Sequence, residues 1–153
     1  MHEIVFDSSI HNYSTTSSEF NRHIIGKKQL AFVIELDNGE CFGYYLHNEI
    51  KKIYHQRTSV DFQSFHFNLL SNGRLHGPMI FEVKNEKFGG YWLYQKTKTD
   101  LISLGDIVLK KNNSNLDSYC SQNNDWFDYH GIENALCGMK QFVPKRIFVI
   151  QMK

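Results

Sequence analysis

The segment from residue 29 to residue 46 carries the clearest hydrophobic pattern in the chain. Apolar side chains occupy both alternating phases of Gln29 to Leu36, and they do so again in Cys41 to Leu46. Successive side chains of a strand point to opposite faces, so this pattern predicts two strands that are covered on both sides. Asn38-Gly39 lies between the two runs. This pair predicts a β-hairpin with a two-residue type I′ turn, because Asn and Gly best tolerate its two positive φ angles.

Shorter apolar runs predict the other strands. They lie at residues 3–6, 64–70, 78–83, 91–95 and 146–152, with two further pieces in 101–109 that are divided near Gly105. One helix is predicted from about residue 17 to residue 25, with a capping box of Thr16 and Glu19 and a C-cap at Gly26. The pattern predicts a mainly β (α+β) fold, a two-sheet antiparallel β-sandwich with one clear N-terminal helix and few short helices.

Two polar stretches interrupt this pattern. Residues 47–57 are polar and basic and are predicted to form a connection, and residues 110–135 are rich in Asn, Ser and Asp. The second stretch is predicted to be a long surface loop. Loops of that length are often functional, so both stretches are the first places to look for a site.

Size and composition agree with one β-rich domain over residues 1–153. The chain has 153 residues, with 12 Phe, 8 Tyr and 2 Trp, and large rings favour half-buried pleated surfaces. Its 17 basic and 16 acidic residues give a net charge of +1. That balance gives no global electrostatic argument for binding nucleic acid or an anionic membrane.

The chain shows no sign of export or membrane insertion. The N-terminal residues lack the basic and apolar regions of a signal peptide, and no apolar run is long enough for a membrane-spanning helix. Three cysteines do not make a disulfide framework for a domain of this size. We therefore expect an intracellular, cytoplasmic protein with reduced thiols, and leave a nuclear location open.

The order of these elements resembles the TLDc domain of the oxidation-resistance proteins. The matching segments, in chain order, are residues 5–8 through Thr16, the helix 20–28, the hairpin 30–46 with Cys41-Phe42-Gly43, the strand 64–69, and Cys137-Gly138 followed by 142–150. The chain departs from the family in lacking a helix-rich N-terminal lead and in its reduced glycine run at 103–109. It therefore resembles a short, divergent, single-domain member.

The resemblance implies a two-sheet sandwich that acts as a non-enzymatic interaction module. TLDc proteins are linked to the oxidative-stress response, and several bind the V-type proton ATPase. We therefore expect a protein partner, with that ATPase as one candidate. The partner-binding residues that we favour lie in the two polar stretches: Lys51, Lys52, Arg57, Trp126 and His130.

The motifs do not predict an enzyme, a cofactor or a metal site. Nucleophile elbows, paired carboxylates and Cys-x-x-Cys or His-x-x-x-His spacings are missing, and Asp125, Asp128 and His130 form only a loose polar cluster. Cys137 lies near Lys140, which can raise its thiolate fraction, so it is the redox candidate, alone or paired with Cys120.

Nucleic-acid binding in the oxidant response is the second alternative. The basic groups that favour it stand in three clusters, namely Lys51, Lys52, His55 and Arg57 beside Tyr54, then Lys96 and Lys98, then Lys110 and Lys111.

Overall fold

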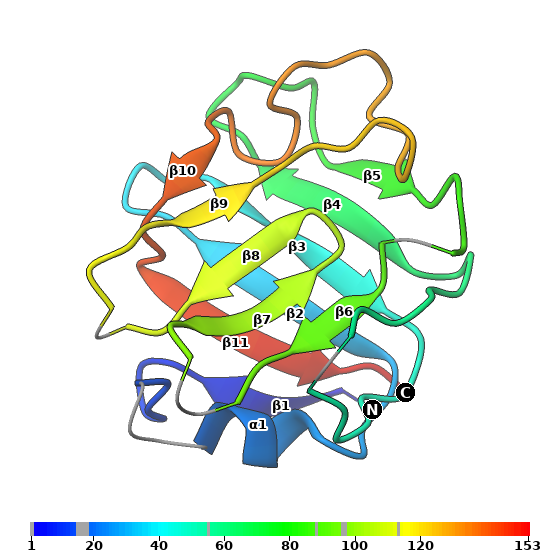
Figure 1. The fold of residues 1–153 in the computed structure, drawn as a ribbon. Helices are drawn as coiled ribbons and strands as arrows, with labels where there is room; N and C mark the ends of the chain where they lie inside the picture. The colour runs from blue at the N-terminus through cyan, green and yellow to red at the C-terminus, as the bar shows by residue number, and fades with distance from the viewer. Residues whose placement is uncertain (1, 15–18, 55, 88, 96–97, 113) are drawn as a thin grey trace.

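The computed structural model describes residues 2–14, 19–54, 56–87, 89–95, 98–112 and 114–153. In this part of the chain, two antiparallel β-sheets pack face to face as a β-sandwich (Figure 1). One short helix lies at an open end between them. The predicted fold class is therefore confirmed.

The larger sheet has six strands in the order β1-β11-β2-β3-β4-β5. Its members are β1 (Glu3–Asp7), β2 (Leu30–Glu35), β3 (Cys41–Leu46), β4 (Phe65–Leu70), β5 (Met79–Glu82) and β11 (Arg146–Gln151). The last strand enters between the first strand and β2, so the two termini lie side by side.

The smaller sheet has five strands in the order β10-β9-β8-β7-β6. Its members are β6 (Tyr91–Leu93), β7 (Asp100–Leu104), β8 (Ile107–Lys110), β9 (Ser118–Cys120) and β10 (Gln141–Phe142). The last two were not predicted, because each is a short segment in polar surroundings with no apolar run to recognise.

The predicted hairpin is the central strand pair of the larger sheet, but its turn differs from the prediction. β2 and β3 pair from Leu30 opposite Leu46 to Glu35 opposite Cys41. The Gly39 N–H donates to the Leu36 carbonyl at 3.1 Å, and of the two central residues only Gly39 has a positive φ, 92°. The type I′ prediction is therefore wrong: the turn spans three residues.

Contacts around Asn38 explain the difference. Its side-chain oxygen accepts from the Glu40 N–H at 2.9 Å, and its carbonyl accepts from the Asn72 side chain in the next turn. These bonds hold Asn38 out of the left-handed conformation that a type I′ turn requires.

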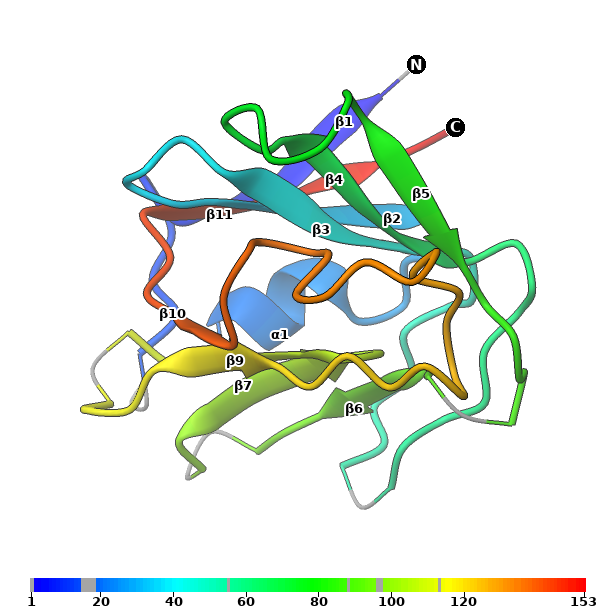
Figure 2. The ribbon, with the colours of Figure 1, turned by 90° about the horizontal axis from the view of Figure 1, so that it is seen from above.

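The core fills the space between the two sheets (Figure 2). The larger sheet supplies inward side chains such as Phe32, Phe42 and Tyr44, and the smaller sheet supplies others such as Leu104 and Leu109. Alternation along each strand places these residues on one face, as the sequence pattern predicts.

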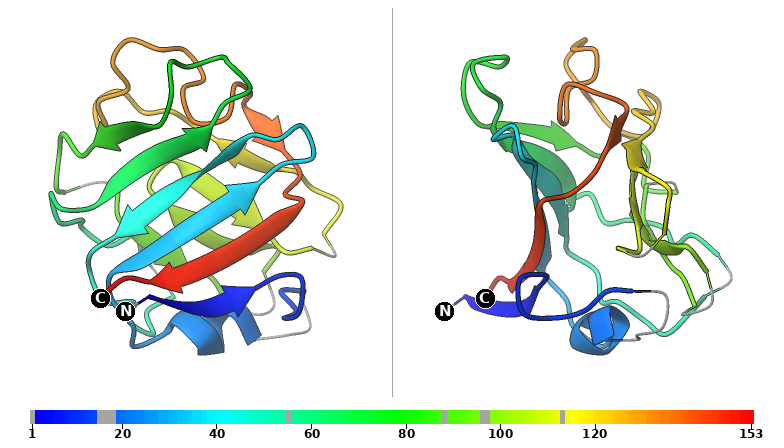
Figure 3. Two further views of the ribbon diagram at one scale, coloured as in Figure 1. Left: turned by 180° about the vertical axis from the view of Figure 1, so that it is seen from behind. Right: turned by 90° about the vertical axis from the view of Figure 1, so that its left-hand side faces the viewer.

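The helix α1 (Glu19–Ile24) closes one end of the sandwich beneath β1 (Figure 3). Phe20 and Ile24 are buried, and the Phe20 ring packs edge-on against Phe6 at 4.8 Å. Gly26 follows with φ 83°, which confirms the predicted left-handed C-cap. The expected capping-box residue Thr16 lies outside the described residues.

The stretch 110–135 is not simply a surface loop. It contains β9, and Phe127 and Tyr129 reach into the core. The Asp128 N–H donates to the Glu82 carbonyl, and the Lys84 N–H donates to the Trp126 carbonyl. This segment therefore covers the edge of β5, a position where polar backbone groups need partners.

In the part of the chain that the structure describes, no helix has the length and apolar character needed to cross a membrane.

Candidate functional site

The face of the larger sheet that points away from the smaller sheet is apolar, and we call it the outer apolar face. No described segment crosses this face (Figure 3). The prediction that β2 and β3 are covered on both sides is therefore wrong for this side. Its side chains come from alternate positions of five strands: Ala31, Val33, Tyr45, Phe65, Phe67, Leu69, Ile80, Phe148 and Ile150.

Neighbouring side chains hide part of this surface from water. Val33, Cys41 and Phe67 form a buried cluster that is separate from the main core. The Phe65 ring lies 5.1 Å from the Tyr45 ring and 6.4 Å from the Phe67 ring. The face is thus an ordered layer of side chains rather than scattered apolar residues.

Gly43 lies in this layer, beneath the ring of Phe67. A Cβ built on Gly43 would lie 1.8 Å from the Phe32 carbonyl oxygen and 2.8 Å from Cζ of Phe67. The ring of Phe67 therefore occupies the space above the glycine, an arrangement that shields backbone from water.

A shallow groove of about 440 Å³ runs along the face. Apart from Tyr45, its lining is entirely apolar: Ala31, Val33, Tyr45, Phe65, Phe67, Leu69, Pro78, Met79, Ile80, Ile150 and Met152. Leu69 is 43% exposed and Ile80 is 50% exposed. Contiguous exposed apolar surface of this kind is typical of protein-binding sites.

One corner of the face carries a charged rim. Arg146 donates to both carboxylate oxygens of Asp7, at 3.1 and 2.7 Å, and lies 3.8 Å from Glu35. The bonds from Arg146 and from the Ser9 N–H hold the pKa of Asp7 well below its usual range. The Arg146 guanidinium also lies 4.8 Å from the centre of the Phe148 ring. This corner is therefore charged near neutral pH and adjoins the apolar surface.

Two of the residues favoured from sequence do meet. The Arg57 guanidinium lies 5.2 Å from the centre of the Trp126 ring. The same guanidinium donates to the carbonyls of Gly90, at 3.1 Å, and Gly105, at 3.0 Å. The N–H groups of Arg57 therefore link the loops that contain Gly90 and Gly105. Burial lowers the pKa of the Arg57 guanidinium.

The other favoured residues lie elsewhere. His130 is on the β5 edge, with its Nε2 3.1 Å from the Ile80 carbonyl oxygen and its ring 5.8 Å from the ring of the buried Phe81, and it does not line the groove. Lys51 and Lys52 are exposed, and the Lys51 N–H donates to the Tyr91 hydroxyl at 2.7 Å. The connection that carries them, between β3 and β4, lies away from the segment around residue 130 (Figure 1). The five residues therefore do not form one patch.

The basic clusters are partly used in internal contacts. Lys110 pairs with Asp100 and lies over the Tyr119 ring, and Lys111 is buried with its ammonium donating to the Gln95 carbonyl at 2.7 Å. Lys51, Lys52 and Lys98 remain exposed. The favoured His55 and Lys96 lie outside the described residues.

A buried polar network connects the two sheets. Nε2 of His66 accepts from the Asp106 N–H at 3.0 Å, and the Asp106 carboxylate accepts from the Tyr129 hydroxyl and the Asn123 N–H, both at 2.6 Å. Burial lowers the pKa of His66 to about 3 and raises the pKa of Asp106. His66, Asp106 and Tyr129 are at most 1% exposed, so this network braces the sheets and does not face solvent.

Cys120 and Cys137 lie in contact, as pairing across the loop would require. Contact with Cys137 and burial both raise the pKa of Cys120. Cys137 is 1% exposed and its thiol donates to the Met139 carbonyl at 3.3 Å. A redox sensor needs a thiol that oxidants can reach, so this burial does not favour that role. Cys41 is also buried.

The polar cluster weighed as a metal site does not assemble. Asp128 lies 3.8 Å from Nδ1 of His130, but Asp125 does not join them as a third ligand. Among the described residues, the one group of three metal-ligating side chains is His11, Glu19 and His23, where the turn after β1 meets α1.

Comparison with protein-family models and with curated proteins identifies no relative of this chain. The sequence matches no protein-family model, and no curated protein matches it.

Proposed function

We propose that this chain is a non-enzymatic interaction module that binds a protein partner through the outer apolar face. The observation that carries the proposal is the contrast between sequence and structure in β2 and β3. Both strands are apolar in both phases, as strands covered on two sides are, yet the described chain covers only one side. A partner protein supplies the second cover.

The make-up of the face agrees with a protein interface. Its centre is aromatic and aliphatic, and Phe and Tyr are enriched in the centres of interfaces. Its corner carries the Asp7–Arg146 pair, and a polar rim around an apolar centre is the usual arrangement. The groove holds too few polar groups to orient a small substrate, which needs several convergent hydrogen-bonding partners.

The identity of the partner rests on the resemblance to the TLDc domain. That resemblance supports the V-type proton ATPase as the partner and a role in the oxidative-stress response. It comes from the order of motifs along the chain, of which the β2–β3 hairpin with Phe42-Gly43 is the most extensive.

Binding of the labelled full chain to purified V-type ATPase, followed by fluorescence anisotropy, tests both parts of the proposal. Ile80→Lys places a charge in the groove and is expected to weaken binding at least tenfold. The control is Leu116→Lys, at an apolar residue that is 57% exposed but lies outside the groove. It is expected to bind like the unmodified chain.

Three other outcomes would overturn part of the proposal. Equal binding by both variants would exclude the outer apolar face. If the ATPase does not bind at all, this partner is excluded. Sedimentation showing a dimer that Ile80→Lys disrupts would identify the cover as a second copy of the chain.

Nucleic-acid binding remains the alternative, and the same assay with duplex DNA decides it. Binding through the exposed Lys51, Lys52 and Lys98 should weaken steeply between low and physiological salt. An absence of binding at low salt would remove the alternative.

A further inference from the structure

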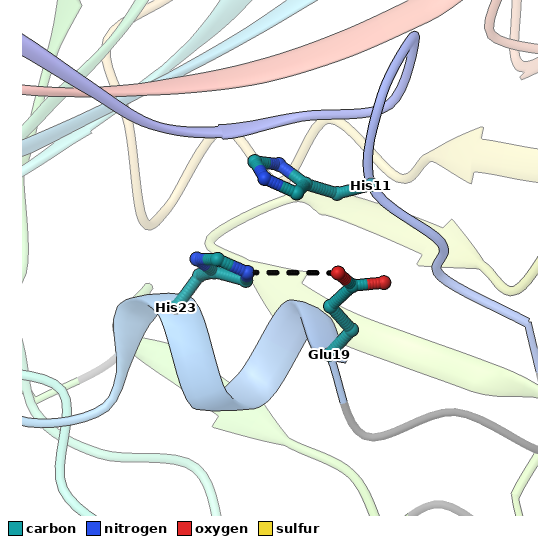
Figure 4. A group of neighbouring side chains, drawn as sticks. All are labelled: His11, Glu19 and His23. Carbon is teal, nitrogen blue, oxygen red and sulfur yellow. Dashed lines mark ion pairs between the residues drawn. The ribbon is translucent and has the colours of Figure 1, made fainter.

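Two imidazoles and one carboxylate come together where the turn after β1 meets α1 (Figure 4). Glu19 and His23 are one helical turn apart, so their side chains share a face of α1, with Oε1 of Glu19 3.8 Å from Nε2 of His23. His11 approaches from the turn, and its ring centre is 4.3 Å from that of His23. One ligand atom from each residue lies within 4.8 Å of the other two.

The His23 ring gives an independent indication of a ligand. Its Nε2 is buried and has no hydrogen-bond partner among the described residues, although the Glu19 carboxylate faces it. Buried polar atoms are almost always hydrogen-bonded, and an exception often marks a bound water or ion. An imidazole nitrogen that faces a carboxylate oxygen across 3.8 Å without a hydrogen bond leaves space that a cation can fill.

We propose that His11, Glu19 and His23 bind a divalent transition metal of the zinc class and thereby link the turn to α1. Imidazole nitrogen and carboxylate oxygen both bind Zn²⁺, at about 2.0–2.2 Å. Ligand atoms of a tetrahedral site are then roughly 3.4 Å apart. The present cluster therefore needs to contract by on the order of 1 Å, with water as the fourth ligand.

The surroundings hold the two rings in place and leave the metal a way in. Phe6, which is fully buried, lies 5.4 Å from the His11 ring and 6.1 Å from the His23 ring. It forms an apolar wall behind both imidazoles, and rings fixed by packing need little ordering when they bind. The side chains of Glu19 and His23 are each 27% exposed, so solvent reaches the edge of the cluster.

Metal binding competes with existing interactions of His11 and Glu19. Nδ1 of His11 accepts from the Asp7 N–H at 3.0 Å, so the neutral ring carries its proton on Nε2. Coordination through Nε2 moves that proton to Nδ1 and breaks the bond to Asp7, which lowers the affinity by about tenfold. Arg22 lies 3.8 Å from Glu19 and competes for it, but its side chain is mostly exposed.

The test is titration of the chelator-treated full chain with Zn²⁺ at pH 7.5, followed by calorimetry. We expect one equivalent to bind with micromolar affinity and to raise the midpoint of thermal unfolding. Substitution with Co²⁺ should give the visible absorption of a site with nitrogen and oxygen ligands. Nitrogen NMR should show the His11 proton moving from Nε2 to Nδ1.

Variants separate this site from adventitious binding. His23→Ala and His11→Ala are each expected to weaken binding by at least tenfold, with folding checked by circular dichroism. Arg22→Ala, on the same helix, should bind as tightly or more tightly, and His76→Ala should change nothing. Unchanged affinity in both histidine variants, or no saturable binding at 1 mM Zn²⁺, would overturn the proposal.

Discussion

The ring of Phe67 lies over Gly43, its partner across the β3–β4 ladder, on the outer side of the larger sheet. Phe67 belongs to a second apolar cluster that is separate from the core between the sheets. An apolar side chain that merely extends into solvent would not pack over the backbone of a glycine as Phe67 does. The contact indicates that the outer apolar face is a built layer.

Gly43→Ala is expected to destabilise the protein by about 2–3 kcal/mol or more, because overpacking forces the backbone to move. The new Cβ would meet the Phe32 carbonyl at 1.8 Å, and a backbone atom has no rotamer by which to withdraw. Urea unfolding measures the loss. Gly73→Ala is the control: its φ is 80° but it has open space around it, so about 1 kcal/mol is expected. Equal losses would contradict the close approach.

Ile80 and Phe81 point to opposite faces of β5, so substitutions at these two positions compare the two faces. They are neighbours in sequence, but Ile80 is 50% exposed and Phe81 is fully buried. Phe81→Ala is expected to cost about 3–5 kcal/mol in free energy of unfolding, and Ile80→Ala less than about 1 kcal/mol. Chemical denaturation gives both values. A large loss from Ile80→Ala would show that the outer apolar face is already covered in the isolated protein.

The strands β2, β3, β4 and β11 could be predicted because each is a six-residue segment that is rich in apolar residues and is visible as such in the local sequence. β9 and β10 could not, because they exist through pairing with their neighbours: Gln141 opposes Tyr119, and Phe142 opposes Ser118. The turn between β2 and β3 likewise depends on a contact with a distant part of the chain. Its type depends on the bond that Asn72 makes to Asn38, 34 positions away in the chain.

The candidate sites also combine features that are visible in the local sequence with features that arise only when the chain folds. Apolarity on both phases of β2 was visible in sequence, but whether a layer covers the second face is a property of the whole assembly. The group of His11, Glu19 and His23 was not predicted, because it contains none of the Cys-x-x-Cys, His-x-x-x-His or His-x-His spacings that mark a metal site in a sequence. The Glu19–His23 spacing is local, whereas the approach of His11 depends on how the turn folds back on α1.

Arg74 holds the segment before β10 against the β2–β3 turn, and Arg74→Lys is expected to cost about 1–3 kcal/mol in free energy of unfolding. Its guanidinium bonds to Glu40 at 2.9 Å and to the carbonyls of Asn134 and Ala135, each at 3.2 Å. A single ammonium cannot span these acceptors. Arg74→Met leaves the buried Glu40 without its cation and is expected to cost about 3–5 kcal/mol.

A double-mutant cycle tests this explanation. Glu40→Met added to Arg74→Met removes the unpaired charge, so the double variant is expected to be more stable than Arg74→Met alone. Thermal unfolding of the four proteins gives the coupling. Additive losses would show that Arg74 and Glu40 act independently.

His66 makes the stability of the sandwich sensitive to acid. Burial lowers its pKa from 6.5 to about 3 in the folded protein, where its Nε2 must stay unprotonated to accept from the Asp106 N–H. Between these pH values the unfolded chain binds a proton that the folded protein does not. Stability is therefore complete above pH 6.5 and falls as the pH drops toward 3, by up to about 1.4 kcal/mol for each pH unit.

His66→Gln removes this titration while keeping groups that can accept from Asp106 and donate to the Gly43 carbonyl. We expect the variant to be less stable than the unmodified protein at pH 7.5, but to lose less stability between pH 6.5 and pH 4. Urea unfolding at a series of pH values measures both slopes. His76→Gln, at an exposed histidine, should leave the slope unchanged. If the slope of His66→Gln matched that of the unmodified protein, the acid sensitivity would belong to another group.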